Sequence, residues 1–144
     1  LTKTMSYEFF DHQADIGIVG VGKSYEQAFQ EGAKAMFEIM CDLKTVKLVK
    51  SISVDATAKD LSELFIEWLN ELLAQKDIVD MLFSSFKVRI TKTKSGYKLT
   101  GVLKGETLNQ KKHRLKVEVK AASYSQLKVW KDKNLYKAQC VVDV

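Results

Sequence analysis

Apolar residues recur along this chain with two different periods, one typical of helices and one typical of strands. Together the two periods restrict the folds that the chain can adopt. In two segments the apolar residues recur every three or four positions, which predicts two helices that each bury one face. The first segment follows Ser24 and the second begins near Asp60, and both starts have the residue spacing of a capping box. The apolar residues of the two segments are Phe29, Ala33, Met36, Phe37 and Met40, then Leu61, Leu64, Phe65, Trp68, Leu69, Leu72 and Leu73.

Most other segments alternate between apolar and polar residues, which is typical of antiparallel strands with one buried face. The alternation is clearest over residues 52–56, 86–90, 115–121 and 136–142, and Ser95-Gly96 suits a hairpin turn. The pattern predicts an α+β fold in which two helices pack on one face of a mostly antiparallel sheet. The length of 144 residues predicts one compact domain, residues 1–144.

The charge of the chain is moderately basic and comes almost wholly from lysine. The formal net charge is +5, and Arg89 and Arg114 are the only arginines. Proteins that recognise phosphates or bases usually do so with arginine, whose planar guanidinium group forms paired hydrogen bonds. The excess of lysine therefore indicates solubility first and RNA contact second.

The positions of the cysteines and the hydropathy of the chain indicate the cellular compartment in which the protein works. Cys41 and Cys140 belong to no CxxC pair and fall in apolar patterns, which predicts buried, inert thiols. No window approaches the roughly 20 apolar residues that cross a bilayer. Residues 1–6 lack the apolar core of a secretory signal. These features predict a cytoplasmic protein with no membrane partner.

The segment from Asp11 to Asp15 gathers two carboxylates and the imidazole of His12 within five residues. Carboxylate oxygens are the ligands that Ca²⁺ and Mg²⁺ take. In an extended strand Asp11 and Asp15 would lie about 13 Å apart, so they can share an ion only if the chain bends. The same residues also suit a plain turn in which Asp11 caps backbone donors. Asp143, which interrupts a β-branched run, is either a further ligand or an exposed chain end.

Signatures of common catalytic sites are missing from the sequence. There is no GxxxxGK[ST] phosphate loop and no GxSxG elbow, and His12 and His113 are the only histidines. The sequence therefore offers few candidates for the nucleophile and the base that a hydrolase needs. The one dense basic run, residues 111–114, suits either a solvated loop or an anion contact.

An ordered set of short segments extends along nearly the whole chain. The segments are Tyr7-Glu8-Phe9, Asp11-His12-x-Ala14-Asp15-Ile16-Gly17, Ala28-Phe29, Ala35-Met36-Phe37-Glu38, Asp60-Leu61, Trp68 to Leu73, Phe83 to Phe86, Gly105-Glu106, His113-x-Leu115-Lys116, Val119-Lys120-Ala121, Tyr124, Leu127-x-Val129 and Val142-Asp143. No single segment is decisive, but the ordered set is specific, and it is similar to the signature of the archease family.

The resemblance implies a compact α+β domain of two related β/α units. It implies a protein cofactor, not an enzyme, for the RtcB-type RNA-splicing ligase, which joins tRNA halves. Such a cofactor promotes guanylylation of the ligase and its repeated turnover, and it meets tRNA indirectly through the ligase. Candidate contacts with the ligase or RNA are Lys111, Lys112, Arg114, Lys120 and Tyr124.

The resemblance also implies a metal site made largely of aspartates. The implied ion is a divalent cation, with Ca²⁺ preferred over Mg²⁺ or Mn²⁺. Its candidate ligands are Asp15, Asp143, Asp11, His12 and the terminal carboxylate of Val144.

Two departures from the family pattern leave these carboxylates in place. Gln13 stands where the family usually has Thr, and Ser125-Gln126 follows Tyr124 where the family often has His. The second departure puts a histidine role at that position in doubt.

The alternative function is a general chaperone or an RNA-binding modulator that uses the lysine-bearing strands. Such a modulator would bind RNA with a steep salt dependence.

Overall fold

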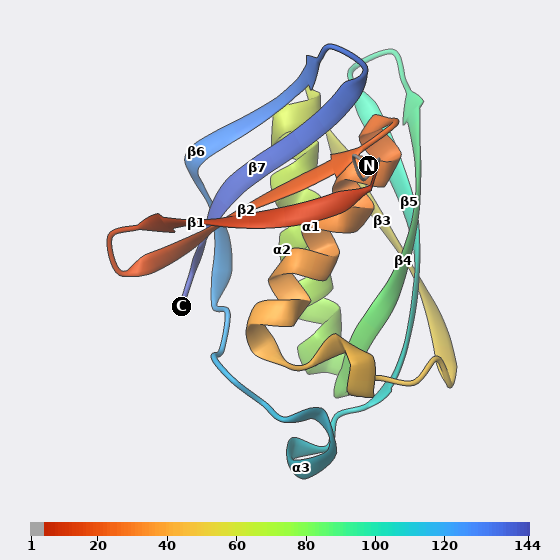
Figure 1. Cartoon of the computed structure of the whole chain (residues 1–144). Coiled ribbons are helices and arrows are strands. Elements are labelled where there is room, and N and C mark those ends of the chain that lie inside the picture. The colour runs from red at the N-terminus through yellow and green to blue at the C-terminus, as the bar shows by residue number, and fades with distance from the viewer. Residues whose placement is uncertain (1–4) are drawn as a thin grey trace.

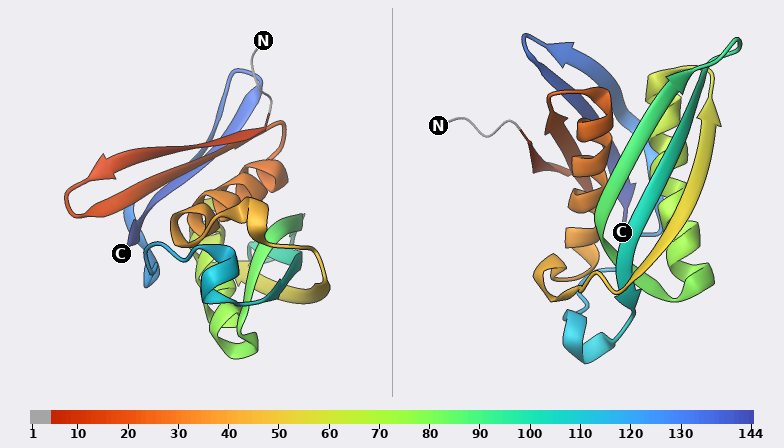
Figure 2. Two further views of the ribbon diagram at one scale, coloured as in Figure 1. Left: turned by 60° about the horizontal axis from the view of Figure 1, so that its bottom comes forward. Right: turned by 90° about the vertical axis from the view of Figure 1, so that its right-hand side faces the viewer.

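The computed structural model of the chain describes residues 5–144. Its two long helices lie between two antiparallel sheets, which Figures 1 and 2 show from three directions. In chain order the elements are β1 (Ser6–His12), β2 (Asp15–Gly22), α1 (Tyr25–Met40), the 3₁₀ helix η1 (Leu43–Thr45), β3 (Lys50–Ala58), α2 (Leu61–Val79), β4 (Met81–Lys92), β5 (Tyr97–Thr107), α3 (Gln110–His113), β6 (Ala121–Asp132) and β7 (Leu135–Asp143). The predicted α+β class is confirmed.

The strands form two sheets, where the sequence had predicted one. The first sheet has the order β1-β2-β7-β6 and the second has the order β3-β5-β4. Each long helix contacts strands of both sheets. A helix in that position must be apolar on more than one side, and ten of the sixteen residues of α1 are buried. The spacing of apolar residues in the sequence had indicated only one buried face on each helix.

Both helices begin where the capping patterns predict. The Ser24 hydroxyl oxygen accepts the Gln27 backbone N–H at 3.1 Å, and the Asp60 carboxylate accepts the Glu63 backbone N–H at 2.8 Å. These side chains satisfy donors that the first turn of a helix leaves without a partner. Local sequence therefore determines both helix starts. The predicted Ser95-Gly96 turn is also confirmed, since it joins β4 to β5.

The predicted strand over residues 115–121 is wrong. Only Ala121 begins a strand, and residues 115–120 form an extended segment across the C-terminal end of α1. The backbone N–H groups of Lys116 and Val117 donate to the carbonyl oxygens of Met40 and Ile39, at 2.9 and 3.4 Å. The carbonyl groups at a helix C-terminus need such partners, so Lys116 and Val117 cap α1 and do not pair with a strand.

No helix in the described part of the chain is long and apolar enough to cross a membrane.

Candidate metal site

The predicted metal ligands come from three neighbouring strands at one end of the first sheet. Asp15 pairs with His12 across the β1–β2 hairpin. Ile16, the next residue, pairs with Val142 on β7, so Asp143 lies level with Asp15. The carboxylate of Asp15 accepts the backbone N–H of Val144 at 3.1 Å. Figure 1 shows the C-terminus beside the β1–β2 hairpin, the arrangement that a site shared by Asp15 and Asp143 requires.

The pleat of the sheet decides which of these side chains share a face. Residues directly opposite on paired strands point the same way, and successive residues alternate. A Cβ added to Gly20 would collide with the carbonyl oxygen of Ala28, so the even-numbered residues of β2 face α1. Asp15 therefore faces away from the helices, and so do its neighbours in the row, His12 and Asp143. We call these three residues the acidic row.

Asp11 lies on the other face of the sheet. It pairs with Ile16, whose side chain is directed towards α1. There Asp11 lines a cavity of about 480 Å³ together with Ile16, Glu38 and Lys116. The two-residue turn at Gln13-Ala14 supplies the bend that the sequence required, with Gln13 in the left-handed region at φ 55°. The bend leaves the two aspartates of the segment on opposite faces.

The carboxylates of the acidic row retain oxygens for a further ligand. Within residues 5–144, neither Asp15 nor Asp143 forms an ion pair with Lys or Arg. Both aspartates are half-buried. No group of three or more His, Cys, Asp or Glu side chains in the described residues is already gathered around one point. The donor set suits a hard cation, because two carboxylates supply oxygen ligands and water completes such a shell.

The predicted contact residues fall into two separate groups. Lys120 and Tyr124 lie beside the acidic row: the Lys120 backbone N–H donates to the Asp143 carbonyl oxygen at 2.8 Å, and Tyr124 is 63% exposed nearby on β6. Lys111, Lys112 and Arg114 belong to α3 and the residue after it, which Figure 1 shows at the far lower end of the molecule. One partner surface around the acidic row would include only the first group.

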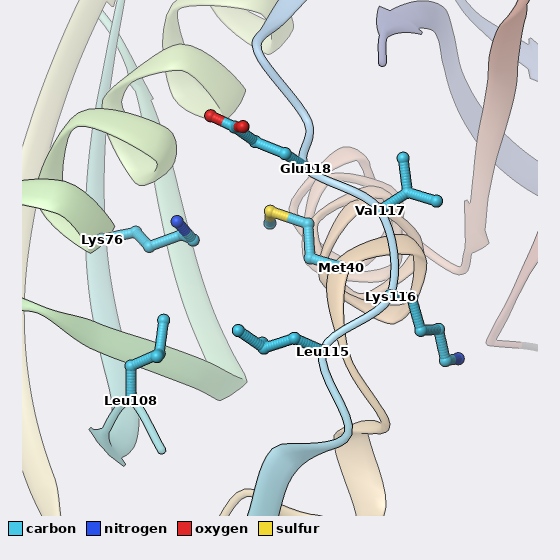
Figure 3. A pocket seen from close by; sticks show the side chains of 7 residues that line it. All are labelled: Met40, Lys76, Leu108, Leu115, Lys116, Val117 and Glu118. Carbon is cyan, nitrogen blue, oxygen red and sulfur yellow. The ribbon is translucent and has the colours of Figure 1, made fainter. Parts of the chain in front are cut away.

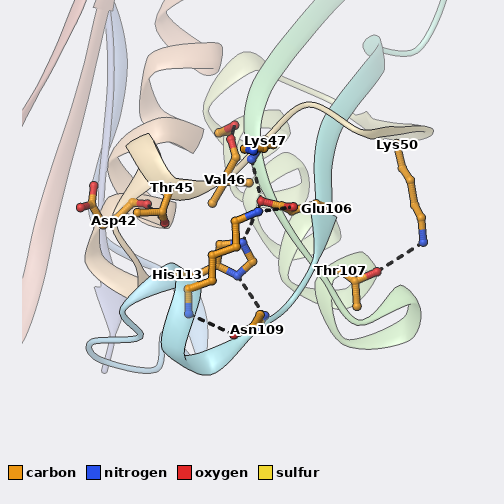
Figure 4. A network of polar contacts seen from close by, with 11 residues as sticks. Asp42, Thr45, Val46, Lys47, Lys50, Glu106, Thr107, Asn109 and His113 are labelled. Carbon is orange, nitrogen blue, oxygen red and sulfur yellow. Dashed lines mark hydrogen bonds and ion pairs between the residues drawn. The ribbon is translucent and has the colours of Figure 1, made fainter.

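The basic run around α3 takes part in a network that the sequence did not reveal (Figure 4). Glu106 accepts hydrogen bonds from the Lys112 ammonium and the Lys47 backbone N–H, each at 2.8 Å. His113 is fully buried, and its Nδ1 accepts the Asn109 backbone N–H at 2.9 Å. Its Nε2 therefore carries the proton and donates to Glu106 at 3.0 Å. The network holds α3 against the loop that follows α1, so its main role is structural.

The same network predicts how stability depends on pH. Hydrogen bonds from His113, Lys112 and Lys47 lower the pKa of Glu106 from 4.5 to about 2. Because the folded-state pKa is the lower one, Glu106 stabilises the fold above pH 4.5, and this contribution is lost as the pH falls towards 2. We expect Glu106→Gln to unfold at lower urea concentration than wild type near neutral pH. The gap should close as both proteins are titrated towards pH 2; a constant gap would contradict the assignment.

Two further features of the described residues are the cysteine thiols and a second cavity. Burial raises the pKa of the Cys41 thiol to about 11 and that of Cys140 to about 12, which confirms the prediction of buried, unreactive thiols. A cavity of about 250 Å³ lies between the ends of α1 and α2 (Figure 3). Its lining residues are Met40, Lys76, Leu108, Leu115, Lys116, Val117 and Glu118, a mainly aliphatic set.

Comparison with known proteins decides the family. Residues 7–144 match the model of the archease protein family. This chain belongs to the archease family.

Archeases of two organisms illustrate how closely the family resembles the chain. The archease of Thermococcus kodakarensis is 40% identical over 125 residues, which cover 87% of this chain and 88% of that protein. The archease of Pyrococcus abyssi is 39% identical over 139 residues, which cover 96% of this chain and 98% of that protein. These alignments extend over nearly the whole length of both relatives.

Solved structures of similar proteins have the same fold. The solution structure of protein 1598 from Methanobacterium thermoautotrophicum superposes with a TM-score of 0.86 at 36% identity, covering 96% of this chain and 99% of that one. A crystal structure from Thermotoga maritima, named an archease and a possible chaperone, has a TM-score of 0.59 at 20% identity and covers 94% of each chain. The archease fold of the chain is thus shared with experimental structures.

Proposed function

We propose that this archease-family chain activates an RtcB-type RNA-splicing ligase and uses the acidic row to hold a divalent cation. The observation that carries the proposal is the alignment of Asp15 with Asp143 on one outward face, next to His12. The chain acts as a protein cofactor in the cytoplasm and promotes guanylylation and repeated turnover of the ligase. Its contact with tRNA in the splicing reaction is made through the ligase.

The chemistry of the row favours a hard cation. Asp15 and Asp143 offer carboxylate oxygens, and the remaining predicted donors at this end of the sheet are His12 and the carboxylate of Val144. Ca²⁺ accepts irregular oxygen shells more readily than Mg²⁺, so it is the preferred ion, with Mg²⁺ and Mn²⁺ as alternatives. A bound cation supplies positive charge that can offset the negative charge of a phosphoryl group in transfer.

A guanylylation assay of the partner ligase tests this function. The ligase is incubated with labelled GTP and a divalent cation, with and without the chain, and the covalent ligase–GMP product is measured. We expect the product to increase with the amount of chain until the two proteins are equimolar. The increase should disappear when the cation is chelated and return when it is restored. Equal product with and without the chain would contradict the proposal.

Cation binding should also raise the melting temperature of the isolated chain. Two carboxylates without a cation repel each other, and an ion that binds only the folded state relieves that repulsion. At a hundredfold excess over the dissociation constant, the gain in unfolding free energy is about 2.7 kcal/mol. Thermal melts with added Ca²⁺, Mg²⁺ or Mn²⁺ measure this shift, with Na⁺ at matched ionic strength as the control. Unchanged melting in all three cations would contradict a cation site.

A chaperone role is the second candidate, and exposed apolar side chains favour it. Phe9, Leu115 and Val117 are 47%, 40% and 46% exposed. Phe9 and Val117 both line the 480 Å³ cavity. Apolar surface of this kind binds unfolded segments. The role predicts that the chain suppresses aggregation of unrelated proteins, a property that ligase activation does not require.

A further inference from the structure

The hairpin of β6 and β7 brings together lysine and aromatic side chains from its two strands. Its strands meet at a tight turn after Asp132, which pairs with Leu135. Lys133 in the turn has φ 59°. Figures 1 and 2 show the tip of this hairpin extending beyond the ends of the helices. The turn and the outward face of the hairpin are open to a partner, whereas Tyr136 on the inward face packs against Tyr25 of α1 with ring centroids 4.7 Å apart.

Lysine ammonium groups lie over aromatic rings on this hairpin. The register pairs Trp130 with Lys137 and Lys131 with Tyr136. The Nζ atoms of Lys128 and Lys137 lie 4.5 and 5.9 Å from the Trp130 ring centroid. The Nζ atom of Lys131 lies 5.3 Å from the Tyr136 ring centroid. The strand pairing thus brings together residues that are seven positions apart in the sequence, Trp130 and Lys137, and five positions apart, Lys131 and Tyr136.

The charge of the hairpin is also unbalanced. Residues 128–137 contain four lysines and one acidic residue, Asp132. Asp132 lies 3.5 Å from the ammonium of Lys137, and the segment keeps a net charge of +3. In the run near α3, by contrast, the Lys112 ammonium is held by Glu106 at 2.8 Å. Of these two segments, the hairpin is therefore the better placed to attract a polyanion.

We propose that the β6–β7 hairpin binds single-stranded RNA, with a base stacked on Trp130 and phosphates contacted by Lys128 and Lys137. Proteins that bind single strands without sequence preference combine lysine-bearing grooves with aromatic side chains for stacking. Lysine suffices for this role because binding without sequence preference depends on the charge of the RNA phosphates and not on hydrogen bonds to the edges of the bases. The surface therefore adds direct RNA contact to the proposed ligase function, which involves no RNA binding by the chain itself.

The position of the hairpin separates this surface from the acidic row. Lys137 and Asp143 are six residues apart on β7, which corresponds to about 20 Å along a strand. Both side chains belong to the outward-facing set of that strand, since Val141 pairs with Gly17 and Val142 with Ile16. Phosphates at the hairpin would thus be kept away from the repulsive carboxylates of the row. A cation bound in the row is not required for RNA to bind the hairpin.

An acidic protein surface is the competing partner, and the aromatic rings argue against it. Carboxylates of a protein partner would need only the lysines, whereas nucleobases also use the face of Trp130. Trp130 is only partly buried, unlike Trp68, which is fully buried in the core. The contribution of the Trp130 ring to binding affinity therefore distinguishes RNA from an acidic protein as the partner.

Fluorescence anisotropy with a labelled uridine oligonucleotide tests the proposal. We expect Trp130→Ala to weaken binding roughly 5- to 150-fold, the loss of one stacked base, and Trp130→Phe to restore most of the affinity. Removing Lys128 and Lys137 together, by K128A/K137A, should lower the slope of log affinity against log salt by about 1.4. The matched control is K98A/K104A, which removes two exposed lysines from β5 on the other sheet.

Each outcome has a defined meaning. Circular dichroism melts of every variant verify folding, and the two lysine variants test the surface even if Trp130→Ala unfolds. Equal losses in K128A/K137A and K98A/K104A would overturn the proposal, because binding would then follow net charge alone. Poly-L-glutamate that binds as tightly as the oligonucleotide, with no effect of Trp130→Ala, would assign the surface to an acidic protein. The assay contains no ligase, so its failure leaves the guanylylation result intact.

Discussion

Asp15→Asn and Asp143→Ala should each reduce ligase guanylylation to the level measured without the chain, while the fold remains intact. Each substitution removes one of the two carboxylates that the register aligns on the outward face of the first sheet. A cation held by two carboxylates loses most of its affinity when one becomes neutral. The amide oxygen of Asn can still accept the Val144 backbone N–H that Asp15 accepts at 3.1 Å. Asp15→Asn thus separates the charge of the residue from its structural hydrogen bond.

The choice of controls makes this comparison specific. Asp55 is an exposed aspartate on β3 of the other sheet, so Asp55→Ala should activate the ligase as well as wild type does. Asp11→Ala should retain most of the activation, because Asp11 faces α1 and not the acidic row. Asp15→Ala adds the loss of the Val144 hydrogen bond, a cost of about 1 kcal/mol in unfolding free energy. Full activation by both Asp15→Asn and Asp143→Ala would make the acidic row structural and refute the cation mechanism.

Trp68→Ala should lower the unfolding free energy by roughly 3–5 kcal/mol, the usual cost of deleting a core aromatic side chain. Trp68 is fully buried on α2, and its indole N–H donates to the Phe29 carbonyl oxygen on α1 at 3.0 Å. Its ring also packs against Gly101 on β5, where an added Cβ would lie only 2.6 Å from the indole. The side chain therefore joins both helices to the second sheet, and urea unfolding monitored by circular dichroism measures the loss.

Two further variants separate packing from the hydrogen bond. Trp68→Phe keeps a buried aromatic ring and loses the indole donor, so its cost should be smaller than that of Trp68→Ala. Trp130→Ala removes a tryptophan that is only partly buried, so it should destabilise the fold less than Trp68→Ala does. A change near zero for Trp68→Ala would contradict the burial of this face of α2.

Features that depend on neighbouring residues were predicted well from the sequence. The helix starts at Ser24 and Asp60 follow from hydrogen bonds that span three residues. The hairpin turn at Ser95-Gly96 is equally local. Trp68 and Leu69 are both fully buried, as the spacing of apolar residues on α2 predicted. The family resemblance, carried by ordered local motifs, was confirmed by the match over residues 7–144.

Features that depend on distant partners could not be predicted from the sequence. Alternation over residues 115–121 indicated a strand, but the free carbonyl groups of Ile39 and Met40 take the backbone donors of this segment. The family resemblance likewise grouped Asp11 with Asp15 as candidate ligands, whereas the pairing of Asp11 with Ile16 turns Asp11 towards α1. A sheet face is assigned only when a strand's register with its neighbours is known, because a shift of one residue reverses every side chain.

The acidic row and the β6–β7 hairpin illustrate this division most clearly. The sequence alone determined that Asp15 and Asp143 exist as candidate ligands, that lysines and Trp130 occur near the end of the chain, and that two helices form. Tertiary structure alone brought Asp143 level with Asp15 and placed Lys137 over Trp130. The physical reason is that strand pairing is a contact between segments far apart in the chain, and its register follows from how the two sheets close over both helices.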